Sequence, residues 1–157
     1  MEKIQKDIDL LASPFREKVK AFLIDVKIQG INNVMPFETR RSHARQAELF
    51  AIGRTIQNTK KPVTWTLKSL HLEWKAVDLV FMQWKTPTWS WDYPRLIEIA
   101  KKYWIRNLSP IETCHFEDES SMPLSIVTTN ISALWGKAND EQKEVLHGCN
   151  EKLRTFI

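Results

Sequence analysis

Apolar side chains recur at helical spacing in four parts of the chain. Gly30 follows the first stretch as a stop signal, and Ser42 and Gly53 flank the second as N-cap and terminator. Pro94 opens the third, where its fixed backbone angle suits a first helical turn. These patterns predict helices over residues 13–29, 43–52, 94–103 and 140–156.

Short apolar runs predict three strands, over residues 63–67, 76–82 and 113–117. Residues 85–92, which contain Pro87, are expected to form a loop. Short strands with segregated helices predict an α+β fold, with a small antiparallel sheet and helices packed on it. No linker or repeat divides the chain, so we expect one domain over 1–157, with 118–157 as a mainly helical extension.

Composition is that of a folded protein, with 43% hydrophobic and 27% charged residues among 157. No apolar run approaches the ~20 residues that span a membrane, so no membrane insertion is expected. The N-terminal residues lack a secretory signal pattern, and the two cysteines make no disulfide framework. We therefore expect a monomeric, cytoplasmic protein, which something else must release if its substrate lies outside.

Charge is unevenly placed along the chain. Residues 1–106 carry 19 Lys+Arg and 11 Asp+Glu, a net +8, whereas residues 107–157 carry 4 and 8, a net −4. A basic half favours an anionic polymer as partner, which nucleic acid and cell wall satisfy equally. No helix-turn-helix, zinc-finger or aromatic RNA-binding signature is found, so nucleic acid is not expected.

Two short segments carry the candidate chemistry. His71, Asp78 and His115 are a ligand set of the kind that catalytic zinc uses, and Glu112 is a carboxylate close by. His71 and Asp78 are an odd number of residues apart, so they converge only if the chain turns between them, plausibly at residues 73–75. Glu112 and His115 need a bend or bulge for the same reason. The alternative is a core histidine satisfied by a nearby carboxylate.

The order Ser69-x-His71, six residues, Asp78, then Glu112-x-x-His115 resembles the zinc D-alanyl-D-alanine carboxypeptidase family. That family includes the vancomycin-resistance dipeptidases and the phage L-alanyl-D-glutamate endolysins. Upstream, Arg41-Ser42, Gln46 and the run Leu49-Phe50-Ala51-Ile52-Gly53-Arg54-Thr55 are similar to the same endolysins. The resemblance covers roughly residues 10–117.

The resemblance implies a function and roles for these residues. His71, Asp78 and His115 would bind one Zn²⁺, Glu112 would be general base and acid, and Arg41 would stabilise the oxyanion or orient the substrate. The substrate would be peptidoglycan, cut at the L-alanyl-D-glutamate bond, in a phage lysis enzyme or a prophage remnant. The alternatives are a D,D-carboxypeptidase or dipeptidase and a non-catalytic cell-wall-binding module.

The chain departs from the family at several positions. Trp74 stands where the family usually has Gly, Cys114 where it often has Trp, and Glu112 where many endolysins have Asp. A further group of aromatic side chains, Trp84, Trp89 and Trp91, could wall a cleft or pack against the core. Two acidic residues, Glu73 and Glu117, flank the ligands. They could support the ligands as outer hydrogen-bond partners, but we expect solvated charges.

Overall fold

Five antiparallel strands form the sheet of this computed structural model, which describes residues 2–121 and 123–157. The strand order is β1-β2-β5-β4, and β3 pairs with the far half of β2. The strands are β1 (Val34–Glu38), β2 (Ala76–Gln83), β3 (Thr86–Thr88), β4 (Ile105–Leu108) and β5 (Glu112–Asp118).

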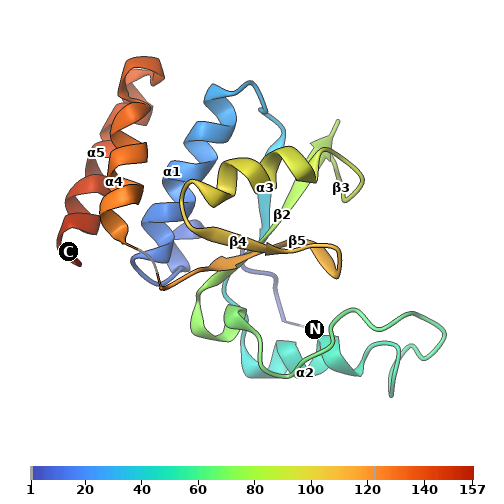
Figure 1. The fold of residues 1–157 in the computed structure, drawn as a ribbon. Coiled ribbons are helices and arrows are strands. Elements are labelled where there is room, and N and C mark those ends of the chain that lie inside the picture. The colour runs from blue at the N-terminus through green and yellow to red at the C-terminus, as the bar shows by residue number, and fades with distance from the viewer. Residues whose placement is uncertain (1, 122) are drawn as a thin grey trace.

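Helices cover one face of the sheet, and a separate helix lies on the other side (Figure 1). Phe81 and Leu79 of β2 are fully buried on the covered face, where Tyr93 packs edge-on against Phe81 and donates to the Leu79 carbonyl. The helices on this side are α1 (Phe15–Ile28), α3 (Tyr93–Lys101), α4 (Leu124–Ala133) and α5 (Asp140–Arg154). On the other side lie α2 (His43–Ala51) and the short 3₁₀ helix η2 (Leu70–Glu73).

The last two helices belong to the same core as the sheet. Ile131 of α4 and Leu146 and Leu153 of α5 are at most 1% exposed, and α5 packs along α1. The α+β fold predicted from the sequence is therefore confirmed as a single small domain with an antiparallel sheet.

Most of the expected elements form close to their expected bounds. The four helices and the strands at 76–82 and 113–117 are confirmed. The strand at 63–67 is wrong, since no strand of the described residues pairs with it. Instead, the Thr64 and Thr66 carbonyls accept hydrogen bonds from the side chains of Arg54 and Gln46.

The sequence patterns also missed β1, β3, β4 and α4. Strand β1 contains Pro36, which weakens a strand pattern, but β1 is an edge strand, where a missing N–H is tolerated. Part of the expected loop at 85–92 is β3, which forms a hairpin with β2. Helix α4 is rich in Ser, Thr and β-branched residues, which are weak helix formers, and its packing on α5 stabilises it.

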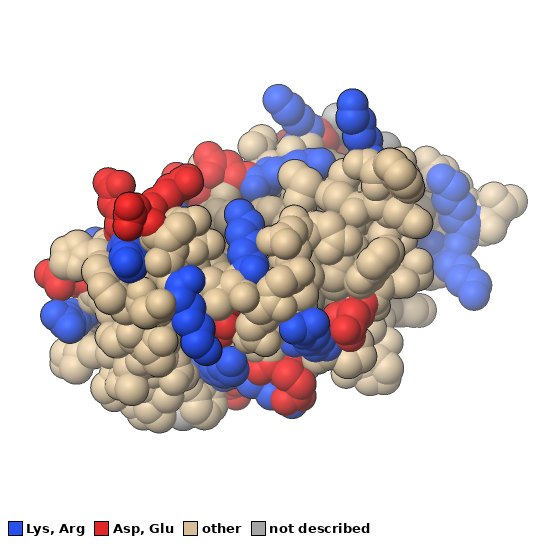
Figure 2. All heavy atoms as spheres, turned by 90° about the horizontal axis from the view of Figure 1, so that it is seen from above, with Lys and Arg blue, Asp and Glu red and all other residues tan. Residues whose placement is uncertain are grey.

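The surface mixes both signs of charge. On the face in Figure 2, Lys and Arg side chains are scattered among Asp and Glu rather than gathered into one basic patch. No helix in the described part of the chain is both long and apolar enough to cross a membrane.

Candidate metal centre

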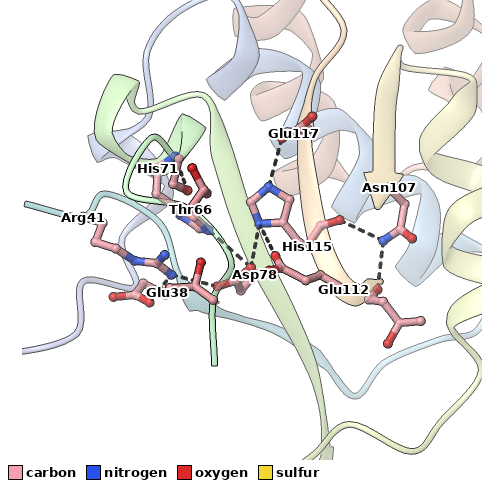
Figure 3. A network of polar contacts seen from close by, with 12 residues as sticks. Glu38, Arg41, Thr66, His71, Asp78, Asn107, Glu112, His115 and Glu117 are labelled. Carbon is pink, nitrogen blue, oxygen red and sulfur yellow. Dashed lines mark hydrogen bonds and ion pairs between the residues drawn. The ribbon is translucent and has the colours of Figure 1, made fainter. Parts of the chain in front are cut away.

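The pairing of β2 with β5 places Asp78 directly opposite His115, and η2 brings His71 to the same point. Asp78 Oδ1 lies 3.2 Å from His71 Nε2 and 3.2 Å from His115 Nδ1. One ligand atom from each of the three residues lies within 4.8 Å of the other two (Figure 3). The structure thus brings together the three residues that the sequence pattern named as zinc ligands.

The turn between His71 and Asp78 forms where the spacing required it. Ser69 is the N-cap of η2, and its hydroxyl accepts from the His71 N–H at 3.4 Å. Trp74 ends η2 in the left-handed conformation, with φ 61° and ψ 28°. Glycine adopts this conformation without strain, which explains the family preference; here the Arg40 guanidinium lies 4.5 Å over the Trp74 ring.

In each histidine, the ring nitrogen that does not face Asp78 forms a hydrogen bond that orients the ring. His71 Nδ1 lies 2.6 Å from the Thr39 carbonyl, which can only accept, so this nitrogen carries a proton. His115 Nε2 lies 3.0 Å from a carboxylate oxygen of Glu117, so this nitrogen is the donor there. The remaining ring nitrogens, His71 Nε2 and His115 Nδ1, therefore face Asp78. Such outer bonds are the usual way to orient metal-ligating histidines.

One ring nitrogen of the cluster is left without a hydrogen bond. His71 Nε2 is buried and has no hydrogen-bond partner among the described residues, although Asp78 Oδ1 lies 3.2 Å away. Zinc ligands ~2.0–2.1 Å from a tetrahedral ion are roughly 3.3 Å apart, close to the two distances found here. The donor set and its spacing fit a zinc ion.

Electrostatics at the cluster favour a charged carboxylate and a basic histidine. Burial alone would raise the pKa of Asp78, but His71 and His115 lower it well below its usual range. Burial lowers the pKa of His115, but its bonds to Asp78 and Glu117 outweigh burial and raise that pKa to about 9. At neutral pH Asp78 is therefore ionised, and His115 is protonated until a cation takes the place of its Nδ1 proton.

Glu117 contradicts the expectation of a solvated charge. It is 5% exposed and lies between His115 Nε2 and the guanidinium of Arg106. Burial raises the pKa of Glu117, but the bonds to His115 and Arg106 lower it overall. Its position two residues after His115 places it on the same face of β5, a signal available in the sequence. Glu73 is exposed, as expected.

A bulge in β5 places Glu112 beside the histidine. In β4, Asn107 pairs with Phe116 of β5, but the next residue, Leu108, pairs with Glu112 of β5. Asn107 spans this irregularity, since its amide nitrogen donates to the carbonyls of Thr113 and His115, both at 2.8 Å. Glu112 Oε2 consequently lies 3.8 Å from His115 Nδ1, with 30% of the side chain exposed.

Arg41 binds Oδ2 of Asp78, whereas the histidines face Oδ1. Its Nη2 donates to Asp78 Oδ2 at 3.2 Å and to Glu38 at 2.6 Å, and its Nη1 donates to Gln46 at 2.8 Å. Glu38 also accepts from Arg45 Nε at 2.5 Å, so one buried carboxylate joins two arginines. Sequence reasoning missed Glu38, which lies on β1, a strand that it did not predict.

A groove of about 830 Å³ passes over these residues. Its floor includes Asp78, His115 and Glu112. Its walls carry large exposed apolar side chains, which are Val63, Trp65, Trp89 and Ile111. Cys114 also lines the groove, and burial raises the pKa of its thiol to about 12, so it is protonated at neutral pH. The arrangement combines a candidate metal site, a nearby carboxylate and a fixed guanidinium in one open groove.

A comparison with solved structures includes the following match. It is the crystal structure of the Serratia marcescens L-Ala D-Glu endopeptidase ChiX, with 21% sequence identity and a TM-score of 0.49. The similarity covers 70% of this chain and 81% of that chain. No protein-family model and no curated protein sequence matches the chain.

Proposed function

We propose that the chain is a zinc metallopeptidase that hydrolyses peptidoglycan stem peptides at the L-alanyl-D-glutamate bond. The observation that carries the metal assignment is that His71 Nε2 and His115 Nδ1 converge on one Asp78 oxygen, while the other nitrogen of each ring is already bonded. The order of the motif residues, described above, supports the substrate class.

The ion would be held by His71 Nε2, Asp78 Oδ1 and His115 Nδ1. A zinc ion in such a set acidifies water and polarises a carbonyl group. Glu112, in the groove beside His115, accepts the proton of the attacking water and returns it to the leaving amine. The two carboxylates thus differ in role, because Asp78 bonds to Arg41 and faces both histidines, whereas 30% of the Glu112 side chain is exposed.

Arg41 supplies fixed positive charge at the second oxygen of Asp78. Because Glu38 and Gln46 hold its guanidinium, the charge needs no rearrangement when an oxyanion develops in the groove. The same contacts keep Arg41 from competing for a ligand position, since it binds the second oxygen of Asp78.

Mass spectrometry of digested peptidoglycan tests the proposal. We expect new fragments that begin with D-glutamate or its amide. A Glu112→Gln variant should keep its zinc but lose most turnover, because Gln is nearly isosteric and cannot accept the proton. Release of D-alanine would indicate the carboxypeptidase alternative. Intact peptidoglycan, with wild-type protein that holds zinc, would contradict the proposed activity.

A further inference from the structure

Thr39 links the metal centre to a segment that lies outside the sheet. It follows Glu38, the last residue of β1, so its main-chain N–H lies beyond the strand pairing. The residue is fully buried, and a buried donor needs a partner. Its N–H donates to the Gln5 carbonyl at 2.8 Å, and its hydroxyl donates to the same carbonyl at 3.2 Å. One main-chain oxygen near the N-terminus therefore satisfies both donors of Thr39.

Residues 2–6, which we call the N-terminal strap, run antiparallel to residues 37–42 on the same side of the sheet as α2 (Figure 1). Four of the five strap side chains are exposed, and the strap contains no helix or strand. It is thus held by a few contacts rather than by the core. These contacts include Glu2 with the Ser42 hydroxyl, Gln5 with Thr39, and Lys6 Nζ 5.4 Å over the Phe37 ring.

Thr39 transmits this contact to the metal centre through its own carbonyl. That carbonyl accepts from His71 Nδ1 at 2.6 Å, a bond that leaves Nε2 of the ring facing Asp78. Two residues further on, the Arg41 N–H donates to the His71 carbonyl at 3.2 Å. His71 is therefore attached to residues 39–41 by both its ring and its main chain, and its orientation depends on where Thr39 is held.

We propose that the N-terminal strap is a positioning element of the metal centre, which fixes Thr39 so that His71 binds the ion. The inference rests on the proposed function, because it concerns the same ion. Loss of the acceptor at the outer nitrogen of a metal-ligating histidine typically lowers metal affinity 10–100-fold. Here the acceptor is a main-chain carbonyl, so its position is fixed only where the peptide itself is fixed, and the strap does this at Thr39.

Zinc affinity of the chain without residues 2–6 tests the strap. Competition with a chromophoric chelator should show at least ~10-fold weaker binding than in the wild type. The metal-free variant should melt within ~5 °C of the metal-free wild type, because the strap lies outside the core. The matched control deletes residues 155–157, another exposed terminal segment, which follows α5. This control should bind zinc as tightly as the wild type.

Two point variants carry the test if the deletion does not fold. Thr39→Val keeps the main-chain groups but loses the hydroxyl that donates to the Gln5 carbonyl, so it should bind zinc at least ~3-fold more weakly. Gln5→Ala keeps the carbonyl itself and should bind zinc as the wild type does. Wild-type affinity in Thr39→Val, or weak binding by Gln5→Ala, would contradict a strap that acts through this carbonyl.

Hydrogen exchange gives a readout that a merely structural strap would not move. Coupling between two sites is reciprocal, so zinc should hold the strap as the strap holds the zinc site. We expect zinc to slow exchange of the Thr39 amide in the full-length protein at least ~10-fold, and to leave the Thr155 amide of the C-terminal turn unchanged.

The outcomes separate the strap from the proposed function. Wild-type zinc affinity in the chain without residues 2–6 would overturn the strap and leave the metal centre standing. Exchange of the Thr39 amide at the same rate with and without zinc would do the same. Wild-type protein that binds no zinc would overturn the metal centre together with the strap.

Discussion

The side-chain amide of Asn107 donates to the main-chain carbonyl of His115 at 2.8 Å, from across the bulge that separates β4 and β5. The same amide also donates to the Thr113 carbonyl, so one side chain replaces the ladder bonds that the bulge removes. The bulge in turn allows Glu112 and His115, three residues apart, to face one groove. The geometry of the site thus depends on a residue outside the cluster of His71, Asp78 and His115.

Asn107→Asp should disturb this arrangement while it preserves side-chain shape. The carboxylate cannot donate, so two carbonyls lose their partner and face a negative charge. We expect a loss of about 2–3 kcal/mol of stability, or roughly 5–10 °C in Tm, and weaker zinc binding. Asn130→Asp is the control, since Asn130 donates to the Lys102 carbonyl at an exposed site. Equal melting temperatures for the two variants would remove Asn107 from this role.

Glu117→Gln should weaken zinc binding about 10–100-fold and leave the fold intact, because it takes away the anion that orients His115. Competition with a chromophoric chelator measures this affinity. The chain offers a matched control in Glu73→Gln. Glu73 stands two residues after His71, as Glu117 does after His115, but it is exposed. If both variants bind zinc equally well, the Glu117 contact does not tune the site.

Arg41→Lys should lower kcat/KM at least ~10-fold, about 1.4 kcal/mol of transition-state stabilisation, with zinc content unchanged. Lysine keeps the charge but cannot span Glu38, Gln46 and Asp78 at once, so Tm should fall as well. Because Tm should fall in either case, kcat/KM decides whether Arg41 acts in catalysis or only in structure. A lower Tm with unaltered kcat/KM would make Arg41 a structural tether between β1, α2 and Asp78.

The sequence reveals the candidate ligands because their side-chain types and order are local features. His71, Asp78 and His115 could be named from the chain, and the turn near Trp74 follows from strand periodicity. Partners that act through the backbone or through strand register could not be named. Thr39 contributes only its carbonyl, and Asn107 depends on a register that no pattern within β4 reveals.

The elements of the fold were predictable where hydrophobic periodicity was strong. They were mispredicted where tertiary contacts, rather than periodicity, decide the backbone conformation. Residues 63–67 alternate like a strand, yet side chains of α2 and the following loop satisfy the Thr64 and Thr66 carbonyls instead of a neighbouring strand. The reverse holds for β1, whose Pro36 conceals an edge strand that pairs with β2.

Metal analysis of purified protein tests the zinc assignment most directly. We expect one equivalent of zinc in the wild type and essentially none in His71→Ala, because two remaining ligands hold zinc poorly. Circular dichroism of the same samples checks that the variant is folded. A folded His71→Ala variant that retains a full equivalent of zinc would contradict the metal centre of His71, Asp78 and His115.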